Sequence, residues 1–452
     1  MEKKKDLKLI IIVGFALFAT FFGAGNLVFP PAIGIVSGAQ WPIAMIGLTI
    51  TGILLPILGV YSIGNAGGSL ENLARPIAPW FAGAYLTFNI IFCAAGSPGK
   101  QAITAVDVGV LGLFPGIGET KFGVQICIFL YLAIVYFLAN NPSKVIEKVG
   151  QYLTPILMVI MGIIVIAAFV KPIDGMQAEP PIPNVFGNAF VNGYLTGDVV
   201  AAMLIGGTFI GTLKQRMNVT NHKQLRSASF KISAIAFAGL FIIYAGLCYL
   251  GATGMKYFEA DMDQTVLLIS LVKKLMGNVG SAFLSVAVLL ACLTTTTGLV
   301  ASMAEITKNA IKKDIPNKLI ILVFLIIGFF VGLLGFRMMV MYLVFPVFYF
   351  IYPMSMVLVV LGAFGRFVPN HGCWKGAIIP AVLFGIYDAI NMLNALGTNI
   401  HVPVIEKIYN VMPFAAQSAA WFVPCVAGFV IGGLIVKLSG KEAYPMGNAF
   451  TE

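Results

Sequence analysis

Two short segments carry the residues with which this apolar chain could bind a small ligand. The first is residues 23–26 (GAGN), inside a run from Leu9 to Ser69 that contains no Asp, Glu, Lys, Arg or His. Glycine continues a helix poorly and asparagine is costly in hydrocarbon, so this segment predicts a helix that is broken in its middle. The second is residues 294–297 (TTTT), four hydroxyl side chains in a row in another apolar segment.

A broken helix exposes two kinds of backbone group that an unbroken helix uses in its own hydrogen bonds. Amides at the start of its second half carry partial positive charge and suit a carboxylate, whereas carbonyls at the end of its first half suit an ammonium group or a small cation. Here the carbonyls would be those of residues 19–22, and the amides those of Gly23, Ala24 and Gly25. One break therefore has both poles that a zwitterionic amino acid needs. Close helix packing is the alternative explanation for the glycines.

The threonine run also has two interpretations. Each hydroxyl can bond a carbonyl one turn back in its own helix, which is a purely structural role. Alternatively, two hydroxyls and a carbonyl complete a cage of oxygen atoms with carbonyls from the first break. Sodium is a hard cation and prefers such oxygen ligands.

The composition excludes a soluble enzyme. The chain has 452 residues, of which 59% are hydrophobic and only 10% charged, whereas soluble domains have about a quarter charged residues. The six cysteines show no CxxC spacing, and the three histidines lie far apart in predicted loops. We therefore expect a polytopic membrane protein without a disulfide framework, a zinc site, an organic cofactor or a catalytic centre.

Apolar windows of the length that crosses a bilayer, ~20 residues, occur twelve times. They are residues 8–36, 42–65, 79–108, 122–139, 149–170, 191–213, 228–251, 279–303, 318–335, 339–363, 374–396 and 414–436.

Lysine and arginine predict the orientation of these spans. If the amino end is cytoplasmic, 20 of the 28 Lys and Arg residues lie on the inside and 7 on the outside. This imbalance predicts a cell-membrane protein with both termini cytoplasmic, and it accounts for the net charge of +10 without nucleic acid. The basic loops 214–231 and 304–318 could also bind anionic membrane lipid.

The predicted spans suggest an internal repeat. The sixth span has a second weak point at residues 206–208 (GGT), five spans after the first break. Transporters built as inverted repeats have discontinuous helices in corresponding places of their two halves. We therefore predict a first repeat at 1–170, a second at 171–363, and two further helices with a carboxyl-terminal tail at 364–452.

Three motifs resemble those of the branched-chain amino acid:cation symporters. They are FGAGNLVFPP at 22–31, FVNGYLTGD at 190–198 and ACLTTTTGLVASMAE at 291–305. That family belongs to the amino acid–polyamine–cation superfamily, which has the leucine-transporter fold. The resemblance implies an all-α protein with 12 transmembrane helices, a 5+5 inverted repeat and discontinuous helices 1 and 6. It also implies sodium-coupled uptake of leucine, isoleucine or valine by alternating access.

The resemblance also assigns the site. The substrate carboxylate would meet the amides of Ala24 and Gly25, and the ammonium would meet the carbonyl of Phe21 and those near 206–208. The predicted substrate-binding residues are Phe21, Gly23, Ala24, Gly25, Asn26, Gly206, Gly207 and Thr208. The predicted sodium ligands are the carbonyls of Ala19, Phe22 and Ala291 and the hydroxyls of Thr294 and Thr295. In relatives that bind two sodium ions, the asparagine that matches Asn26 holds the second.

One departure from the family bears on the substrate. Residues 99–101 (GKQ) stand where the family usually has proline-arginine-threonine. Lys100 keeps the charge but not the planar fork of arginine, so the side chain either alters the substrate pocket or has a structural role such as snorkelling or pairing with Asp107. A proton-coupled or exchanging permease for another amino acid is therefore the alternative function.

Two other acidic residues in the apolar segments have structural interpretations. Asp198 is expected to cap the start of a helix, and Asp388 to join a polar cluster with Asn391 and Asn394. A channel is disfavoured because the sequence has no repeated ring of carbonyls or like charges.

Overall fold

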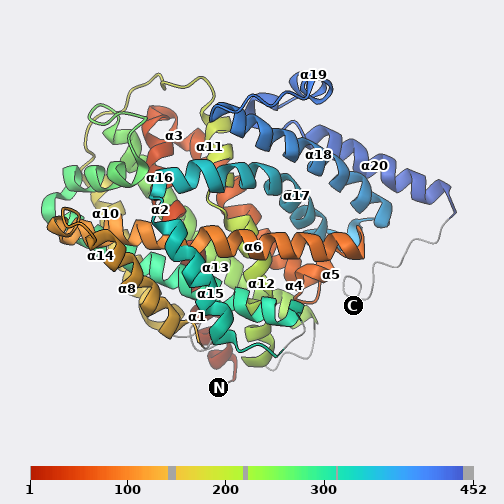
Figure 1. Ribbon diagram of the computed structural model, residues 1–452, viewed down its shortest axis with the longest axis horizontal. Coiled ribbons are helices and arrows are strands. Elements are labelled where there is room, and N and C mark those ends of the chain that lie inside the picture. The colour runs from red at the N-terminus through yellow and green to blue at the C-terminus, as the bar shows by residue number, and fades with distance from the viewer. Residues whose placement is uncertain (1, 141–148, 217–221, 312–313, 441–452) are drawn as a thin grey trace. The chain divides into compact units, whose positions relative to one another are not determined.

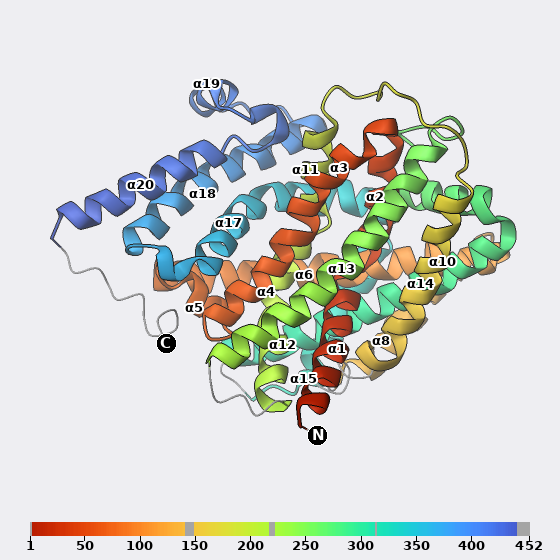
Figure 2. The same ribbon diagram turned by 180° about the vertical axis from the view of Figure 1, so that it is seen from behind.

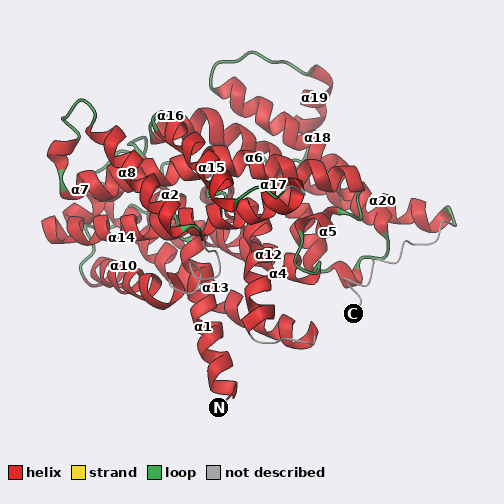
Figure 3. Cartoon of the chain, turned by 60° about the horizontal axis from the view of Figure 1, so that its bottom comes forward, coloured by secondary structure: helices red, strands yellow, loops and turns green. Residues whose placement is uncertain are grey.

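The computed structural model of the protein describes residues 2–140, 149–216, 222–311 and 314–440. Within these ranges the chain is helical, without a β-strand (Figures 1 and 3). Short π-helical turns at Thr49–Leu54, Ala105–Val110, Val149–Leu153 and Val340–Val344 adjoin longer helices. The α-helices are α1 (Glu2–Phe21), α2 (Ala24–Ile35), α3 (Trp41–Leu48), α4 (Leu55–Asn65), α5 (Leu70–Ala74), α6 (Pro79–Thr104), α7 (Leu111–Leu113), α8 (Gly123–Leu138), α10 (Thr154–Val170), α11 (Val185–Leu195), α12 (Asp198–Arg216), α13 (His222–Gly254), α14 (Gln264–Ile311), α15 (Asn317–Gly332), α16 (Phe336–Met339), α17 (Phe345–Ala363), α18 (His371–Ala395), α19 (Pro403–Val411) and α20 (Phe422–Leu438).

The apolar helices follow the predicted spans closely. Among the described residues, seven helices are long and apolar enough to cross a membrane, or nine when each of two bent pairs counts as one span. Three shorter apolar helices, α8, α15 and α20, cover the remaining predicted spans. Every predicted window thus contains an apolar helix, while the count of twelve crossings stays a prediction.

The chain forms two compact units, and each combines segments that are distant in the sequence. Unit 1 contains residues 1–53, 93–196 and 231–339, and unit 2 contains residues 54–92, 197–230 and 340–452. These units are groups of residues in mutual contact, whereas the predicted repeats are related by symmetry. The contact units therefore do not test the predicted repeat boundaries at 170 and 363, which stay predictions.

In unit 1, α14 is the helix on which most of the others pack. It contacts α1, α2, α8, α10 and α15, and it also lies against the π-helical turn that follows α6. The helical path is interrupted at Gly277, whose φ of 66° lies in the left-handed region. The predicted window 279–303 thus lies wholly on the carboxyl-terminal side of this kink.

Helix α2 is fixed to α13 by backbone-to-backbone contact (Figure 2). A Cβ atom at Gly34 would overlap the carbonyl oxygen of Cys248, and a Cβ atom at Gly251 would overlap that of Pro31. Two glycines, one on each helix, thus allow an approach that no other residue permits, as is common between membrane helices. This contact holds the second half of the first span in place.

In unit 2, α18 packs against both α17 and α20, and α17 packs against α4. The Ser62 hydroxyl of α4 donates a hydrogen bond of 2.7 Å to the carbonyl of Val359 in α17. On α18, buried Asp388 accepts a hydrogen bond from the Tyr409 hydroxyl of α19. Asp388 thus takes part in an interhelical polar contact, as predicted, whereas Asn394 bonds the amide and the carbonyl of Ile400 in the following turn.

The α2–α13 contact gives a prediction about stability. Changing Gly34 to alanine forces the two backbones apart, and overpacking of this kind costs typically 1–3 kcal/mol. We expect Gly34→Ala to lower the temperature at which purified protein in detergent stays monodisperse. Gly162→Ala on α10 is the control, because a Cβ atom there has no neighbour within 4 Å. Equal thermal stability of the two variants would contradict the close contact.

Candidate substrate and cation site

The first predicted span consists of two helices, α1 and α2, bent by 66° relative to each other. α1 ends at Phe21 and α2 begins at Ala24, so Phe22 and Gly23 form the break. Gly23 has φ −112° and ψ −161°, an extended conformation that interrupts the helical hydrogen bonds. The break expected at residues 23–26 is confirmed, with Asn26 in the first turn of α2.

Side chains of unit 1 meet the polar backbone groups that this break leaves open. The amide of Ala24 donates a hydrogen bond of 2.8 Å to the Gln101 side-chain oxygen. The carbonyl of Phe21 accepts one of 2.6 Å from the Asn26 side chain, whose nitrogen also contacts the Tyr244 hydroxyl. The positive end of α2 thus faces an oxygen and the negative end of α1 faces a donor, as the helix dipoles favour.

The four threonines of α14 divide into two pairs. Thr295 donates a hydrogen bond of 2.9 Å to the carbonyl of Ala19 in α1, and Thr294 lies 3.3 Å from the same carbonyl and 3.0 Å from that of Ala291. Thr296 and Thr297 bond instead to carbonyls one turn back in α14, at 2.7 and 2.6 Å. Only the first pair therefore joins α14 to the broken helix.

Four of the five predicted sodium ligands therefore share one buried cluster of oxygen atoms. The carbonyls of Ala19 and Ala291 and the hydroxyls of Thr294 and Thr295 are linked by the hydrogen bonds just described. Phe22, the fifth, lies in the break, and its ring stacks on Phe18 with centroids 5.2 Å apart. These groups are neutral oxygens from two elements, which is a donor set that fits a small hard cation.

The second break does not lie where the sequence analysis placed it. Residues 206–208 are inside the continuous helix α12, and the sixth span is instead interrupted between α11 and α12, at Thr196 and Gly197. Gly197 has a φ of +87°, which is strained for any residue with a side chain, whereas an α-helix accommodates glycines in its interior. The prediction of a break at Gly206 and Gly207 is therefore wrong, because both glycines keep the helical conformation and Gly197 is the one with a left-handed φ.

Gly206 and Gly207 of α12 serve close packing within unit 2. A Cβ atom at Gly207 would lie 2.5 Å from the carbonyl oxygen of Gly68, and one at Gly206 would lie 3.1 Å from the Cβ of Ile63. The carbonyl of Thr208 accepts a hydrogen bond of 2.9 Å from the Thr212 hydroxyl. Their expected part in substrate binding rested on a break at this place, and the carbonyl end of the first half of the sixth span is at Thr196 instead.

Two charged residues, Asp198 and Lys100, lie at the second break. Helix α12 begins at Asp198, so this carboxylate lies in the first turn of the helix, and its role as a cap stays a prediction. Lys100 of α6 is only 6% exposed, and its ammonium nitrogen donates a hydrogen bond of 3.2 Å to the carbonyl of Thr196. This lysine therefore binds the carbonyl end of α11, a role that the sequence analysis did not foresee.

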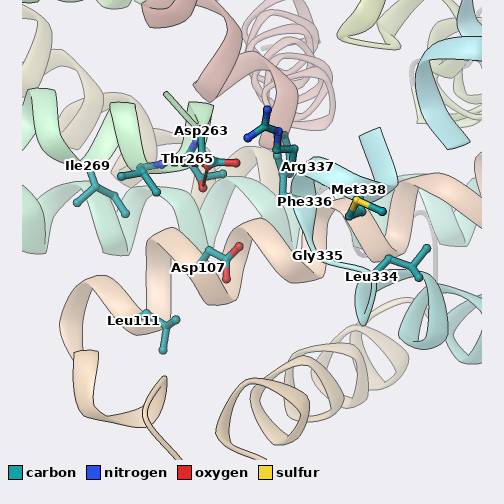
Figure 4. A pocket seen from close by; sticks show the side chains of 11 residues that line it. Asp107, Leu111, Asp263, Thr265, Ile269, Leu334, Gly335, Phe336, Arg337 and Met338 are labelled. Atoms are coloured by element: carbon teal, nitrogen blue, oxygen red, sulfur yellow. Dashed lines mark hydrogen bonds between the residues drawn. The ribbon is translucent and has the colours of Figure 1, made fainter. Parts of the chain in front are cut away.

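A cavity of about 400 Å³ in unit 1 contains charged side chains but none of the predicted site residues (Figure 4). Asp107, Asp263 and Arg337 face it from three different segments. Asp263 accepts hydrogen bonds from the amides of Thr265 and Val266, at 2.9 and 3.3 Å, and so caps the start of α14. Helix capping thus accounts for Asp263. Because this cavity contains none of the predicted site residues, the break in the first span remains the candidate site.

Solved structures show which fold these broken helices belong to. The chain is similar to Mhp1, a nucleobase-cation-symport-1 family transporter solved with bromovinylhydantoin bound, with a TM-score of 0.58, 12% identity, and coverage of 91% of this chain and 96% of that one. It is also similar to MhsT in complex with L-phenylalanine, with a TM-score of 0.56, 16% identity, and coverage of 94% and 98%. The chain therefore has the leucine-transporter fold of these two transporters, with discontinuous helices 1 and 6.

The family follows from the sequence comparisons. Residues 6–439 match the model of the branched-chain amino acid transport protein family. The chain is 30% identical to the branched-chain amino acid permease BraB of Bacillus subtilis over 453 residues, 98% of each protein. It is 31% identical to the permease BrnQ of Salmonella typhimurium, covering 96% of this chain and 97% of that one. The chain belongs to the branched-chain amino acid transport protein family.

The position of the second break can be tested directly. Gly197→Ala should disrupt it, because the left-handed backbone costs roughly 1–2 kcal/mol with a side chain and the new Cβ atom would lie 2.5 Å from the Phe348 ring. We expect lower thermal stability in detergent and loss of uptake in vesicles. Gly211→Ala in α12 is the matched control, since its Cβ atom would have no neighbour within 4 Å. Full activity of Gly197→Ala would show that the break does not depend on this glycine.

Proposed function

We propose that this protein is a secondary active transporter that brings a branched-chain amino acid into the cell together with sodium, by alternating access. The proposal for the substrate is supported by membership of the family and by the names of its relatives. The proposal for sodium is supported by the hydroxyls of Thr294 and Thr295, which reach across from α14 to the carbonyl of Ala19 beside the break.

The break suits an amino acid because it presents opposite partial charges a short distance apart. The substrate carboxylate would bind the amides of Ala24 and Gly25, and the ammonium would bind the carbonyl of Phe21. In the structure, the Ala24 amide is bonded to Gln101 and the Phe21 carbonyl to Asn26. Substrate binding therefore exchanges hydrogen bonds that the chain makes with itself for hydrogen bonds to a charged ligand, which are the stronger kind.

The sodium site would use the same break from its other side. An ion that binds the carbonyls of Ala19 and Ala291 and the hydroxyls of Thr294 and Thr295 replaces the hydrogen bonds among them. The hydroxyls would then present lone pairs to the ion and turn their protons elsewhere. Sodium and substrate would thus bind to adjacent parts of one broken helix, which provides a physical route for coupling.

A proton-coupled permease is the second candidate, and the position of Lys100 favours it. This amine is buried in a predicted membrane span and bonded to the carbonyl of Thr196. A buried ionisable group in a membrane helix is a common part of proton pathways. The two candidates differ in which ion gradient drives uptake.

Uptake by proteoliposomes distinguishes them. With an inward sodium gradient and no pH gradient, we expect saturable accumulation of labelled leucine, with isoleucine and valine as competitors. A tenfold sodium gradient supplies ~1.4 kcal/mol, so one-to-one coupling supports about tenfold accumulation without a membrane potential. A zwitterion and one sodium ion together carry one positive charge, so an inside-negative potential should increase uptake. Accumulation that follows only an acid-outside gradient would favour the proton-coupled permease.

The threonine pairs provide a second test. Thr294→Val and Thr295→Val keep the shape but remove an oxygen that we assign to the ion. Bonds to charged groups are worth about 1.5–3 kcal/mol, so the sodium concentration for half-maximal uptake should rise by about tenfold or more in each variant. Maximal uptake at saturating sodium should fall less.

The control is Thr297→Val, whose lost hydroxyl bonds only to the Leu293 carbonyl among the contacts described here. Such bonds in membrane proteins average ~0.6 kcal/mol, so its sodium dependence should stay near that of the parent. Thr296→Val is a less clean control because its hydroxyl also contacts Tyr131. If all four variants keep the parent's sodium dependence, the cation site lies elsewhere.

A further inference from the structure

Gln101 lies beside the break in the first span, on the neighbouring helix α6. Its side chain is 4% exposed, and its oxygen accepts the 2.8 Å hydrogen bond from the amide of Ala24. A free amide in the first turn of a helix carries partial positive charge and is costly to bury without a partner. Gln101 is thus the acceptor that satisfies this amide.

The Gln101 side chain also occupies the space beside the glycine of the break. A Cβ atom at Gly23 would lie 2.6 Å from the Gln101 nitrogen and 3.0 Å from its oxygen. The primary amide group therefore covers the α-carbon of Gly23 while it bonds the next residue. In our assignment of the substrate, the carboxylate group needs both this space and this amide.

The backbone of α6 is held firmly at this point. A Cβ atom at Gly99 would lie 2.7 Å from the carbonyl oxygen of Gly328 in α15, so the two helices touch through their backbones. Lys100, the next residue, bonds the carbonyl of Thr196 at the second break. The Gln101 side chain can therefore leave the Ala24 amide while its helix stays in place.

We propose that the side-chain amide of Gln101 is the resident occupant of the carboxylate subsite and that the substrate displaces it. This inference rests on the proposed function, because it takes the ligand to carry a carboxylate. A side-chain amide is neutral, whereas a carboxylate forms a charge-assisted hydrogen bond that is roughly twice as strong. The exchange therefore favours the substrate, and the amide of Ala24 has an acceptor both before and after binding.

A side chain that occupies the subsite lowers the affinity for the substrate, because it must be displaced. A side chain that binds the substrate raises that affinity. Removing a competitor strengthens binding, whereas removing a ligand weakens it. The direction of the change in a single variant thus distinguishes the two roles. Because the competitor is displaced by any ligand at this amide, leucine and leucinamide should both be affected by its removal.

The experiment measures equilibrium binding of labelled leucine, and its competition by leucinamide, on the full-length purified protein with saturating sodium. Gln101→Met has similar length but only a weak sulfur acceptor, so we expect leucine and leucinamide each to bind about threefold to tenfold more tightly. Gln101→Glu places a permanent negative charge on the amide, and leucine should bind at least tenfold more weakly. Gln101→Asn is too short to reach Ala24 in the same way and should change affinity in the same direction as methionine.

The control is Thr104→Val, one turn further along α6. Among the residues that the structure describes, its buried hydroxyl bonds only the carbonyl of Lys100 in the same helix, at 2.9 Å, so leucine affinity should be that of the parent. If Gln101→Met or Gln101→Asn is monodisperse and binds leucine with unchanged or weaker affinity, the proposal is overturned and Gln101 is structural or a direct ligand. If the parent protein itself binds no branched-chain amino acid, the proposed function fails instead.

Discussion

A helix that breaks inside a membrane must find a partner for every backbone group that the break exposes, because hydrocarbon offers none. At three positions, the first span of this protein meets that requirement with side chains of unit 1. Gln101 accepts from the amide of Ala24, Asn26 donates to the carbonyl of Phe21, and Thr295 donates to the carbonyl of Ala19. The rest of unit 1 serves to deliver these side chains, α6 from one side and α14 from another.

The need for partners at the break also explains how the site can be stable without a ligand and still bind one. The three partners just named are side chains, so their hydrogen bonds can be exchanged for bonds to a ligand without unfolding the helix ends. The carbonyl of Phe21 also accepts a hydrogen bond of 2.8 Å from the amide of Gly23, which belongs to the turn itself. The neutral character of the partners also matters, since charged ligands form the stronger hydrogen bonds.

Much of this arrangement could be predicted from the sequence, for identifiable reasons. The break at Phe22 and Gly23 was visible because glycines and an asparagine interrupt a long run with no charge. The pairing of Thr294 and Thr295 with Ala19 followed from the resemblance to a family, and the helical turn of about 100° per residue explains why Thr296 and Thr297 face elsewhere.

What the sequence could not show depends on contacts between distant residues. Gln101 lies 77 positions from Ala24, and no local pattern links them. The second break was misplaced because two adjacent glycines are more conspicuous than one. A better signal was available at residues 196–198 (TGD), where a glycine that can take a left-handed φ is followed by an acidic residue suited to the first turn of a helix.

The two halves of the first span are attached to the protein in different ways. α2 meets α13 through glycines and backbone atoms, at Gly34 and Gly251, and such a contact cannot be loosened without pulling whole helices apart. α1 meets α14 through hydroxyl-to-carbonyl hydrogen bonds, which an ion or a rotated side chain can replace. The hydrogen bonds between α1 and α14 are therefore the more easily exchanged of these two attachments, whereas the contact between α2 and α13 joins backbone atoms that no ligand can replace.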